Sequence, residues 1–300
     1  MSQALALFLP AAMMVLMLAL GLRLHARDIG AVLAAPRALL TGLAVQVIVL
    51  PLIAVLLILM LGLSTPLAAG LLLVAAAPGG VSSNYMAHLA RGSVALSVTM
   101  TAITSLLAPL TLPLVLGLTG VARLASGDLV RVSLGMAAIG VLPLAIGMVM
   151  AARTPRLAQC VHNRLAPAAK ALFALMVLAT FWQNRAAMAE AAGQAGAAVG
   201  LLAMGAPLSA LLAARLARLT PTEARTIAIE ASLQNVAITL FVAGTLLRQP
   251  TLAVPGLIHA VAMNLVALVL ILRSRQGESP ALTAEALPPV TTAVTRAPRQ

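Results

Sequence analysis

Glu230 is an acidic residue deep inside a long apolar segment of the chain, in the run Ile227-Ala228-Ile229-Glu230-Ala231. An ionised carboxylate at the centre of a bilayer costs roughly 2.5 to 3.5 kcal/mol on insertion scales. A cation, a proton or a buried partner must offset that cost. Because no intramembrane Lys or Arg is evident that could pair with it, the sequence predicts that the protein moves a charged species across a membrane.

Several neutral oxygen-bearing side chains could join Glu230 in one cation site. Ser97 and Thr101 are four residues apart, so their hydroxyls share one face of a helix, and Glu230 and Gln234 have the same spacing. Gln46 is a lone amide in another apolar segment. Hard oxygen ligands suit Na⁺ and disfavour soft transition metals. The alternative is structural, because such hydroxyls often bond to their own helix and such amides often join two helices.

The composition indicates the kind of protein that must position these residues. Of its 300 residues 62% are hydrophobic and 9% are charged, and the mean hydropathy of +1.07 exceeds that of soluble domains. The net charge of +12 is spread singly between apolar runs, so nucleic acid is not an expected partner. The single cysteine, Cys160, offers neither a disulfide nor a cysteine-rich metal site. The chain is therefore expected to be a polytopic, all-α membrane protein.

Nine apolar segments have the length of a membrane-spanning helix. Their approximate ranges are 4–22, 38–62, 67–90, 94–118, 129–151, 165–185, 193–214, 222–247 and 252–272. When the N-terminus is placed outside, fifteen of the nineteen basic residues fall on one side of the membrane, and only Arg123, Arg131, Arg185 and Arg248 fall on the other. The positive-inside rule then predicts a cytoplasmic C-terminus. Residues 276–300 lack periodicity and are expected to form a disordered cytoplasmic tail after a transmembrane domain of residues 1–275.

Two of the nine segments are irregular. Pro78-Gly79-Gly80 interrupts the third and predicts a broken helix. The eighth carries Glu230 and Gln234 at its middle, although no Pro or Gly signals a break there. Each irregular segment is followed by one last helix of its half, and the two cross the membrane in opposite directions. This pattern predicts inverted repeats that meet at a site near the midplane.

Two motifs resemble the signatures of the bile acid:sodium symporter family. The first runs from Pro78 to Met86 and on to Val98, and the second is Glu230-Ala231-Ser232-Leu233-Gln234-Asn235. The resemblance covers about residues 5–273 and implies two crossing discontinuous helices. It also implies a panel domain, made of segments 4–22, 129–151 and 165–185, and a core domain, made of residues 38–118 and 193–272.

The resemblance further implies two sodium ions as coupling ions. The ligands implied for the first are Ser83, Asn84, Ser97, Thr101 and Glu230. Those implied for the second are Gln46, Glu230 and Gln234, with the carbonyls of Ala231 and Leu233. Bacterial members often have ten helices, and this chain is expected to lack the first of them, which agrees with an outside N-terminus.

The departures from the family pattern concern the substrate. Val81 stands where relatives often have Thr, Ser232 replaces a frequent Gly, and Met263 precedes Asn264 where a His-Asn pair is common. The expected substrate contacts are Asn235, Asn264, Val81 and Ser82. Since two polar groups are lost, the substrate of a characterised relative cannot be transferred to this chain.

The expected function is sodium-coupled symport of an organic anion, bile-acid-like or a small carboxylate or sulfonate, across a bacterial inner membrane by alternating access. Membrane lipid is an expected partner, and no obligate protein partner is evident. A proton-coupled carrier that uses Glu230 is the alternative. A membrane sensor would lack any soluble signalling domain, and an intramembrane enzyme would lack a nucleophile and base pair, so the chain is not expected to be an enzyme. His259 is interpreted as structural, with a proton relay as its alternative.

Overall fold

A computed structural model describes residues 3–24, 30, 32, 36–80, 82–120 and 125–276 of the chain. Within these ranges the chain is almost entirely helical, and its β-type pairing is limited to an isolated antiparallel bridge between Gly79 and Gln234. This architecture confirms the predicted all-α fold. The predicted tail lies, from residue 277 onward, outside the described residues, as does Val81.

The first half of the chain supplies four helical units. They are α1 (Gln3–Gly21), the continuous run of α3 (Pro36–Ala44), η1 (Val45–Val49) and α4 (Leu50–Leu61), the broken pair α5 (Thr65–Ala76) and α6 (Ser83–Leu89), and α7 (Val94–Thr119). Pro66 stands in the first turn of α5, where a missing N–H costs nothing, whereas Pro51 lies inside the continuous run, directly after the π-helical turn η1. Gly62 ends α4 with a φ of 57°, a left-handed conformation that glycine adopts without strain.

The second half of the chain contains the longest helix and the second broken pair. Its elements are α8 (Ser126–Met136), η2 (Ala137–Val141), α9 (Leu142–Arg153), α10 (Pro155–Leu216), α11 (Pro221–Ser232), α12 (Val236–Phe241), η3 (Val242–Leu246), η4 (Pro250–Leu252) and α13 (Ala253–Gln276). The nonhelical residues 233–235 separate α11 from α12. The predicted break in the eighth apolar segment is therefore present.

The helices have the dimensions and surface of a multi-pass membrane protein. Among the described residues, six helices are long and apolar enough to cross a bilayer, and these are Pro36–Leu61, Val94–Thr119, Ser126–Arg153, Pro155–Ala191, Gly193–Leu216 and Pro250–Ser274. Three shorter apolar helices cover 8–21, 65–76 and 236–246. Large apolar side chains point outward, with Leu59, Leu118 and Leu216 at least 75% exposed. Such a surface suits lipid contact, while the exact number of nine spans stays a prediction.

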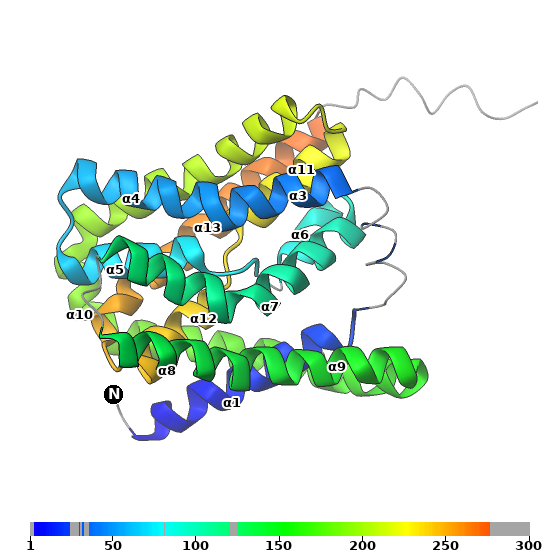
Figure 1. Ribbon diagram of the computed structural model, residues 1–300, viewed down its shortest axis with the longest axis horizontal. Coiled ribbons are helices and arrows are strands. Elements are labelled where there is room, and N and C mark those ends of the chain that lie inside the picture. The colour runs from blue at the N-terminus through cyan, green and yellow to red at the C-terminus, as the bar shows by residue number, and fades with distance from the viewer. Residues whose placement is uncertain are drawn as a thin grey trace, which may run out of the picture.

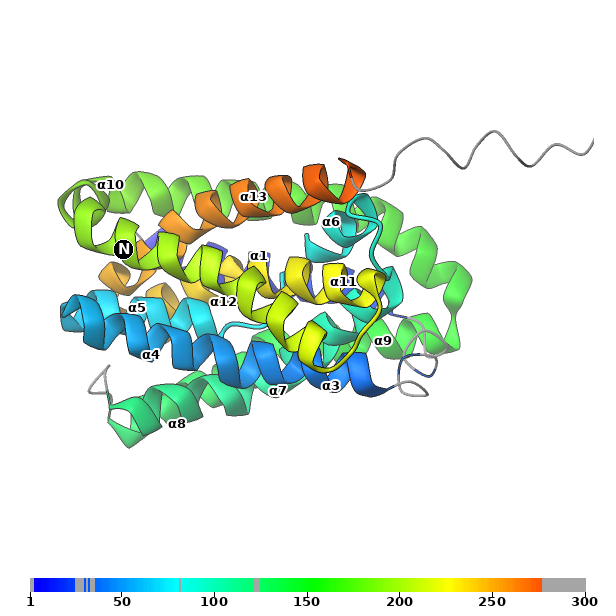
Figure 2. The same ribbon diagram turned by 90° about the horizontal axis from the view of Figure 1, so that it is seen from above.

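The region of α10 differs from the predicted boundaries. The prediction placed polar connections at 152–164 and 186–192, but the chain is helical throughout 155–216. In Figures 1 and 2 the ribbon of α10 runs to one end of the molecule, turns there and returns. The predicted connection at 152–164 was wrong from residue 155 onward, because loss of hydropathy was taken as the end of a helix. The two predicted spans themselves fall within the candidate spans Pro155–Ala191 and Gly193–Leu216. Arg156 and Arg164 are exposed, and a charged exposed face does not interrupt backbone hydrogen bonding.

The helices pack in two groups. In Figure 1, α1, α8 and α9 lie along one edge, and α5 and α7 lie between them and the blue helices α3 and α4. α1 contacts α9 and α10, whereas α13 contacts α5, α11 and α12 as well as α10. The division into a panel and a core domain stays a prediction.

The N-terminus of α11 is held by a complete capping box. The hydroxyl of Thr220 accepts a hydrogen bond from the backbone N–H of Glu223, whose carboxylate accepts one from the backbone N–H of Thr220. Thr220→Ala is expected to lower the free energy of unfolding by about 1 kcal/mol. Thermal denaturation of the purified protein measures this loss. The sodium response should stay as in wild type, and a weakened sodium response would mean that this cap also shapes the Glu230 region.

Candidate functional site

The two nonhelical segments cross each other in the interior. The backbone N–H of Gly80 donates to the carbonyl of Leu233 at 2.7 Å, and the N–H of Asn235 donates to the carbonyl of Pro78 at 2.9 Å. These bonds satisfy backbone groups that helix breaks expose inside a membrane. Four residues from segments far apart in the sequence are thereby joined at one point.

Gly79 and Gly80 at the crossing cannot carry a side chain freely, because atoms of the other broken segment lie close to both of them. A Cβ on Gly79 would lie 2.0 Å from Oε1 of Glu230, and a Cβ on Gly80 would lie 3.1 Å from the carbonyl oxygens of Leu233 and Gln234. The Glu230 carboxylate therefore rests directly against the backbone of the other broken segment. The sequence signals the flexibility of this motif but not this contact.

Glu230 is fully buried and is held by two hydroxyls of α7. Ser97 Oγ donates to Oε2 and Thr101 Oγ1 donates to Oε1, each at 2.5 Å. Asn84 Oδ1 lies 2.9 Å from Ser97 Oγ and 3.5 Å from Thr101 Oγ1. Ser83 Oγ lies within 3.5 Å of both hydroxyls. The structure thus brings together all five side chains that were expected around one ion.

The oxygens of this cluster outnumber the protons that can be shared between them, which suits a bound cation. Each hydroxyl has one proton to donate. Ser97 and Thr101 direct theirs at the carboxylate, and Ser83 donates to the carbonyl of Gly80 at 2.7 Å. No hydroxyl proton is then left for the Asn84 carbonyl oxygen, which faces lone pairs. Oxygens gathered with too few protons between them are stabilised by a small hard cation such as Na⁺.

A second set of oxygens surrounds the crossing on the side of α3 and α4. Gln46 Nε2 donates to Gln234 Oε1 at 2.8 Å and to the carbonyl of Ala77 at 3.3 Å. Gln46 Oε1 is buried without a hydrogen-bond partner among the described residues. The carbonyls of Ala231 and Leu233 each accept one hydrogen bond, from Gln234 Nε2 and Gly80 N, and keep a second lone pair. A buried amide oxygen without a partner, on a side chain that is hydrogen-bonded to Gln234, also fits a cation.

Two further threonines position the site, and the sequence did not identify either role. Thr226 on α11 accepts a hydrogen bond from the backbone N–H of Ser93 at 2.7 Å, and so joins α11 to the turn before α7. A Cβ on Gly92 would lie 2.7 Å from the same hydroxyl. Thr104 accepts from the N–H of Gly79 at 3.4 Å. For the contact between Thr104 and Gly79, the sequence offered only the helical spacing that places Thr104 and Ser105 near the face of Thr101.

The expected substrate contacts are not all close to the crossing. Asn235 is 5% exposed and caps α12, because its Oδ1 accepts from the N–H of Ile238. Ser82 is exposed just before α6. Asn264 is exposed on α13 and donates to the carbonyl of Ala260. Of the described candidates, Asn235 alone forms part of the crossing, and the substrate role of each stays a prediction.

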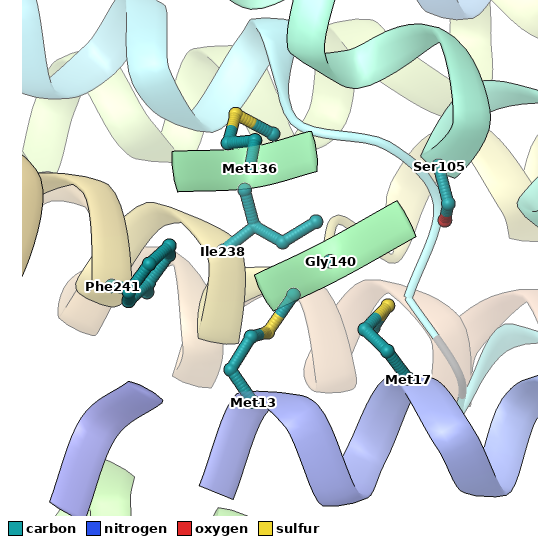
Figure 3. A pocket seen from close by; sticks show the side chains of 7 residues that line it. All are labelled: Met13, Met17, Ser105, Met136, Gly140, Ile238 and Phe241. Carbon is teal, nitrogen blue, oxygen red and sulfur yellow. The ribbon is translucent and has the colours of Figure 1, made fainter. Parts of the chain in front are cut away.

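A small cavity lies where the expected panel meets the expected core. Its volume of about 10 Å³ is room for about one water-sized molecule. Figure 3 shows the side chains of Met13 and Met17 extending from α1 toward Gly140. The residues that line it are Met13, Met17, Ser105, Met136, Gly140, Ile238 and Phe241. Because methionine is flexible and adaptable, this contact between α1, α8 and η2 on one side and α7 and α12 on the other is apolar and deformable.

Comparison with known proteins identifies the class. Residues 10–191 match the model of the Sodium Bile acid symporter family. The chain is 31% identical over 258 residues, 85% of its length, to a probable sodium/metabolite cotransporter, BASS1, of Arabidopsis thaliana chloroplasts. It is 28% identical over 255 residues, 83% of its length, to a probable sodium/metabolite cotransporter, BASS2, of Oryza sativa subsp. japonica chloroplasts.

The chain therefore belongs to the sodium bile acid symporter family. A bacterial relative, described as an uncharacterized sodium-dependent transporter, YocS, of Bacillus subtilis (strain 168), is 39% identical over 102 residues, 34% of this chain and 32% of its own length. The chain spans 63% of the length of the BASS1 relative and 59% of that of the BASS2 relative. The family and these relatives are named as transporters, not as enzymes.

Proposed function

We propose that this protein is a secondary transporter of a bacterial inner membrane that couples inward movement of Na⁺ to uptake of an organic anion. One observation carries the proposal. Glu230 is 0% exposed, makes no ion pair with a basic side chain among the described residues, and is surrounded by hydroxyl and amide oxygens from α6 and α7. A charge in such a place is a functional group by default.

Two ions share the Glu230 carboxylate in this proposal. The ligands of the first are Ser83, Asn84, Ser97, Thr101 and Glu230. Those of the second are Gln46, Glu230 and Gln234, with the carbonyls of Ala231 and Leu233. Because both sites include the crossing, sodium binding would hold the two broken helices together. The names of the relatives, which describe sodium cotransporters, support the choice of Na⁺.

The anion would bind beside the crossing, where amide donors such as that of Asn235 are buried. Asn235 Nδ2 has no hydrogen-bond partner among the described residues. Two sodium ions bring positive charge close to this point and offset the charge of a carboxylate or sulfonate. Movement of the panel against the core, at the deformable methionine contact, would alternate access. Each net positive charge that moves inward gains about 2.3 kcal/mol per 100 mV of membrane potential.

Loss of a single neutral ligand should weaken sodium binding without abolishing it. We expect Ser97→Ala and Thr101→Val each to raise the sodium concentration for half-maximal thermal stabilisation about tenfold, because one ligand and one hydrogen bond to Glu230 are lost. Titration of the purified protein with NaCl at constant ionic strength measures this. Thr99→Val is the control, since Thr99 is buried on the same helix but its hydroxyl has no hydrogen-bond partner among the described residues. An unchanged sodium requirement in both variants would remove these residues from the site.

Uptake by proteoliposomes separates the proposal from its rivals. Candidate carboxylates and sulfonates are first screened for thermal stabilisation of the protein in NaCl, and the stabilising compounds are then tested for uptake. We expect uptake under an inward sodium gradient with equal pH on both sides. Uptake driven by a pH gradient and indifferent to Na⁺ would indicate the proton-coupled carrier. Binding in NaCl without uptake under any gradient would indicate a sensor.

A further inference from the structure

His259 lies on α13 and belongs to neither proposed ion site. Its ring is 1% exposed, and neither Nδ1 nor Nε2 has a hydrogen-bond partner among the described residues. A neutral imidazole has one N–H donor and one acceptor nitrogen. Burying both without partners is unfavourable, and an apolar residue would fill the same space at no such cost. The position of His259 therefore calls for a role besides packing.

The register between α13 and the second broken helix places His259 beside the break. A Cβ on Gly256 would lie 2.9 Å from Cγ2 of Thr239, so this point of α13 meets α12. The His259 ring, one turn further along α13, lies next to the backbone of Ser232, the last residue of α11. Gly256 thus lies beside Thr239, and His259, later in α13, lies beside Ser232, earlier in the chain. α13 therefore runs antiparallel to the broken helix formed by α11 and α12. This register sets His259 level with the nonhelical residues 233–235.

Two other buried polar groups at this interface are also without partners. Asn235 Nδ2 and Thr239 Oγ1 make no hydrogen bond among the described residues, and both side chains are at most 5% exposed. The two residues are four positions apart at the start of α12, so they share one face of that helix. Thr239 meets α13 through Gly256. His259 on α13, and Asn235 and Thr239 at the start of α12, thus each bury a polar atom that has no hydrogen-bond partner among the described residues, and α12 and α13 contact each other.

We propose that His259 is a positioning residue that holds the break between α11 and α12 in the shape that sodium binding requires. One ring nitrogen donates to the carbonyl of Ser232 and the other accepts from one N–H of the Asn235 amide, after small rotations of the ring and the amide, and the second N–H of that amide is left for the anion. The segment so held contains the carbonyl of Leu233 and the side chain of Gln234. This inference rests on the proposed function, because those two groups are ligands of the second proposed ion.

Sodium titration of variants at position 259 tests this role. His259→Phe keeps the buried volume and removes both hydrogen-bonding atoms, whereas His259→Gln keeps a donor and an acceptor. We expect the Phe variant to fold and to need about tenfold more NaCl for half-maximal thermal stabilisation, and the Gln variant to stay within about threefold of wild type. Thr99→Val again controls for loss of a buried, unpaired polar group. If the Phe variant yields no folded protein, His259→Met replaces it.

The outcomes separate this inference from the proposed function. If NaCl stabilises the wild-type protein and the Phe variant needs no more NaCl than wild type, the proposed role of His259 is overturned and sodium coupling stands. An equal rise in Thr99→Val, or no rescue by Gln, also overturns it, because the effect would then be a general loss of stability or of shape. Wild-type protein with no response to NaCl overturns the proposed function, and this inference with it.

Discussion

Replacement of Glu230 by Gln is expected to abolish the sodium response of the protein. Gln keeps the size of the side chain, and its one carbonyl oxygen can still accept a hydrogen bond from Ser97 or Thr101, while its NH2 group can donate to the other hydroxyl after that hydroxyl rotates. It removes the charge that both proposed ions share. The attraction between unit charges about 4 Å apart is about 4 kcal/mol at an effective dielectric constant of about 20, which corresponds to about a thousandfold in affinity. Thermal stability in NaCl and in KCl, at equal ionic strength, should then be the same.

Glu223→Gln is the matched control for this variant. Glu223 lies on the same helix, but at its exposed N-terminus, and Gln can replace Glu in a capping box. We expect its sodium response to match that of wild type. The Glu230→Gln substitution should also leave the protein folded in KCl, since it removes the cost of burying a charge. If E230Q kept the wild-type sodium response, Glu230 would not be an ion ligand.

Gly79→Ala is expected to be as damaging as loss of the carboxylate itself. The added Cβ would lie 2.0 Å from Oε1 and 2.9 Å from Cδ of Glu230. The backbone at this point is fixed by hydrogen bonds from Gly80 N and Asn235 N, so the carboxylate must move away from Ser97 and Thr101. Overpacking of this kind costs about 1 to 3 kcal/mol. We expect a lower denaturation temperature in KCl and no stabilisation by NaCl, both read from one thermal titration.

Gly205→Ala provides the comparison for the glycine variant. Gly205 lies within α10, where a Cβ would meet Ile53 at 3.7 Å, an ordinary van der Waals distance. Alanine is favoured over glycine inside a helix by about 1 kcal/mol. This variant should therefore be as stable as wild type or more stable, with an unchanged sodium requirement. A normal sodium response in G79A would contradict the close contact between Gly79 and the carboxylate.

The two helix breaks differ in how well the sequence predicts them. Pro78, Gly79 and Gly80 act locally, because proline lacks an N–H and glycine lacks a Cβ, so the first break is predictable from the residues alone. Residues 233–235 carry no such signal. Their conformation depends on hydrogen bonds to Pro78 and Gly80, which lie far away in the sequence. The second break is a tertiary effect, and it was indicated by the polar residues around it, by its matching position in the second half of the chain and by the resemblance to the family.

The site was predictable in its residue types and less so in its contacts. Helical spacing places Ser97 and Thr101 on one face, and the structure directs both at Glu230. Spacing cannot place two distant segments against each other, so the contact with Gly79 and the bond from Ser93 to Thr226 were not predicted. The substrate contacts were the weakest part, because the motif that suggested Asn264 says nothing of its exposure.

Equilibrium binding of radioactive sodium to the purified protein tests the central claim most directly. It needs no knowledge of the substrate, and it counts the ions that the chain holds. The account predicts saturable binding that approaches two ions per chain in wild type, competition by unlabelled NaCl but not by KCl, and loss of saturable binding in E230Q. Wild-type protein that binds no sodium, or E230Q that binds as much as wild type, would contradict the claim that Glu230 is the shared ligand of coupled sodium ions.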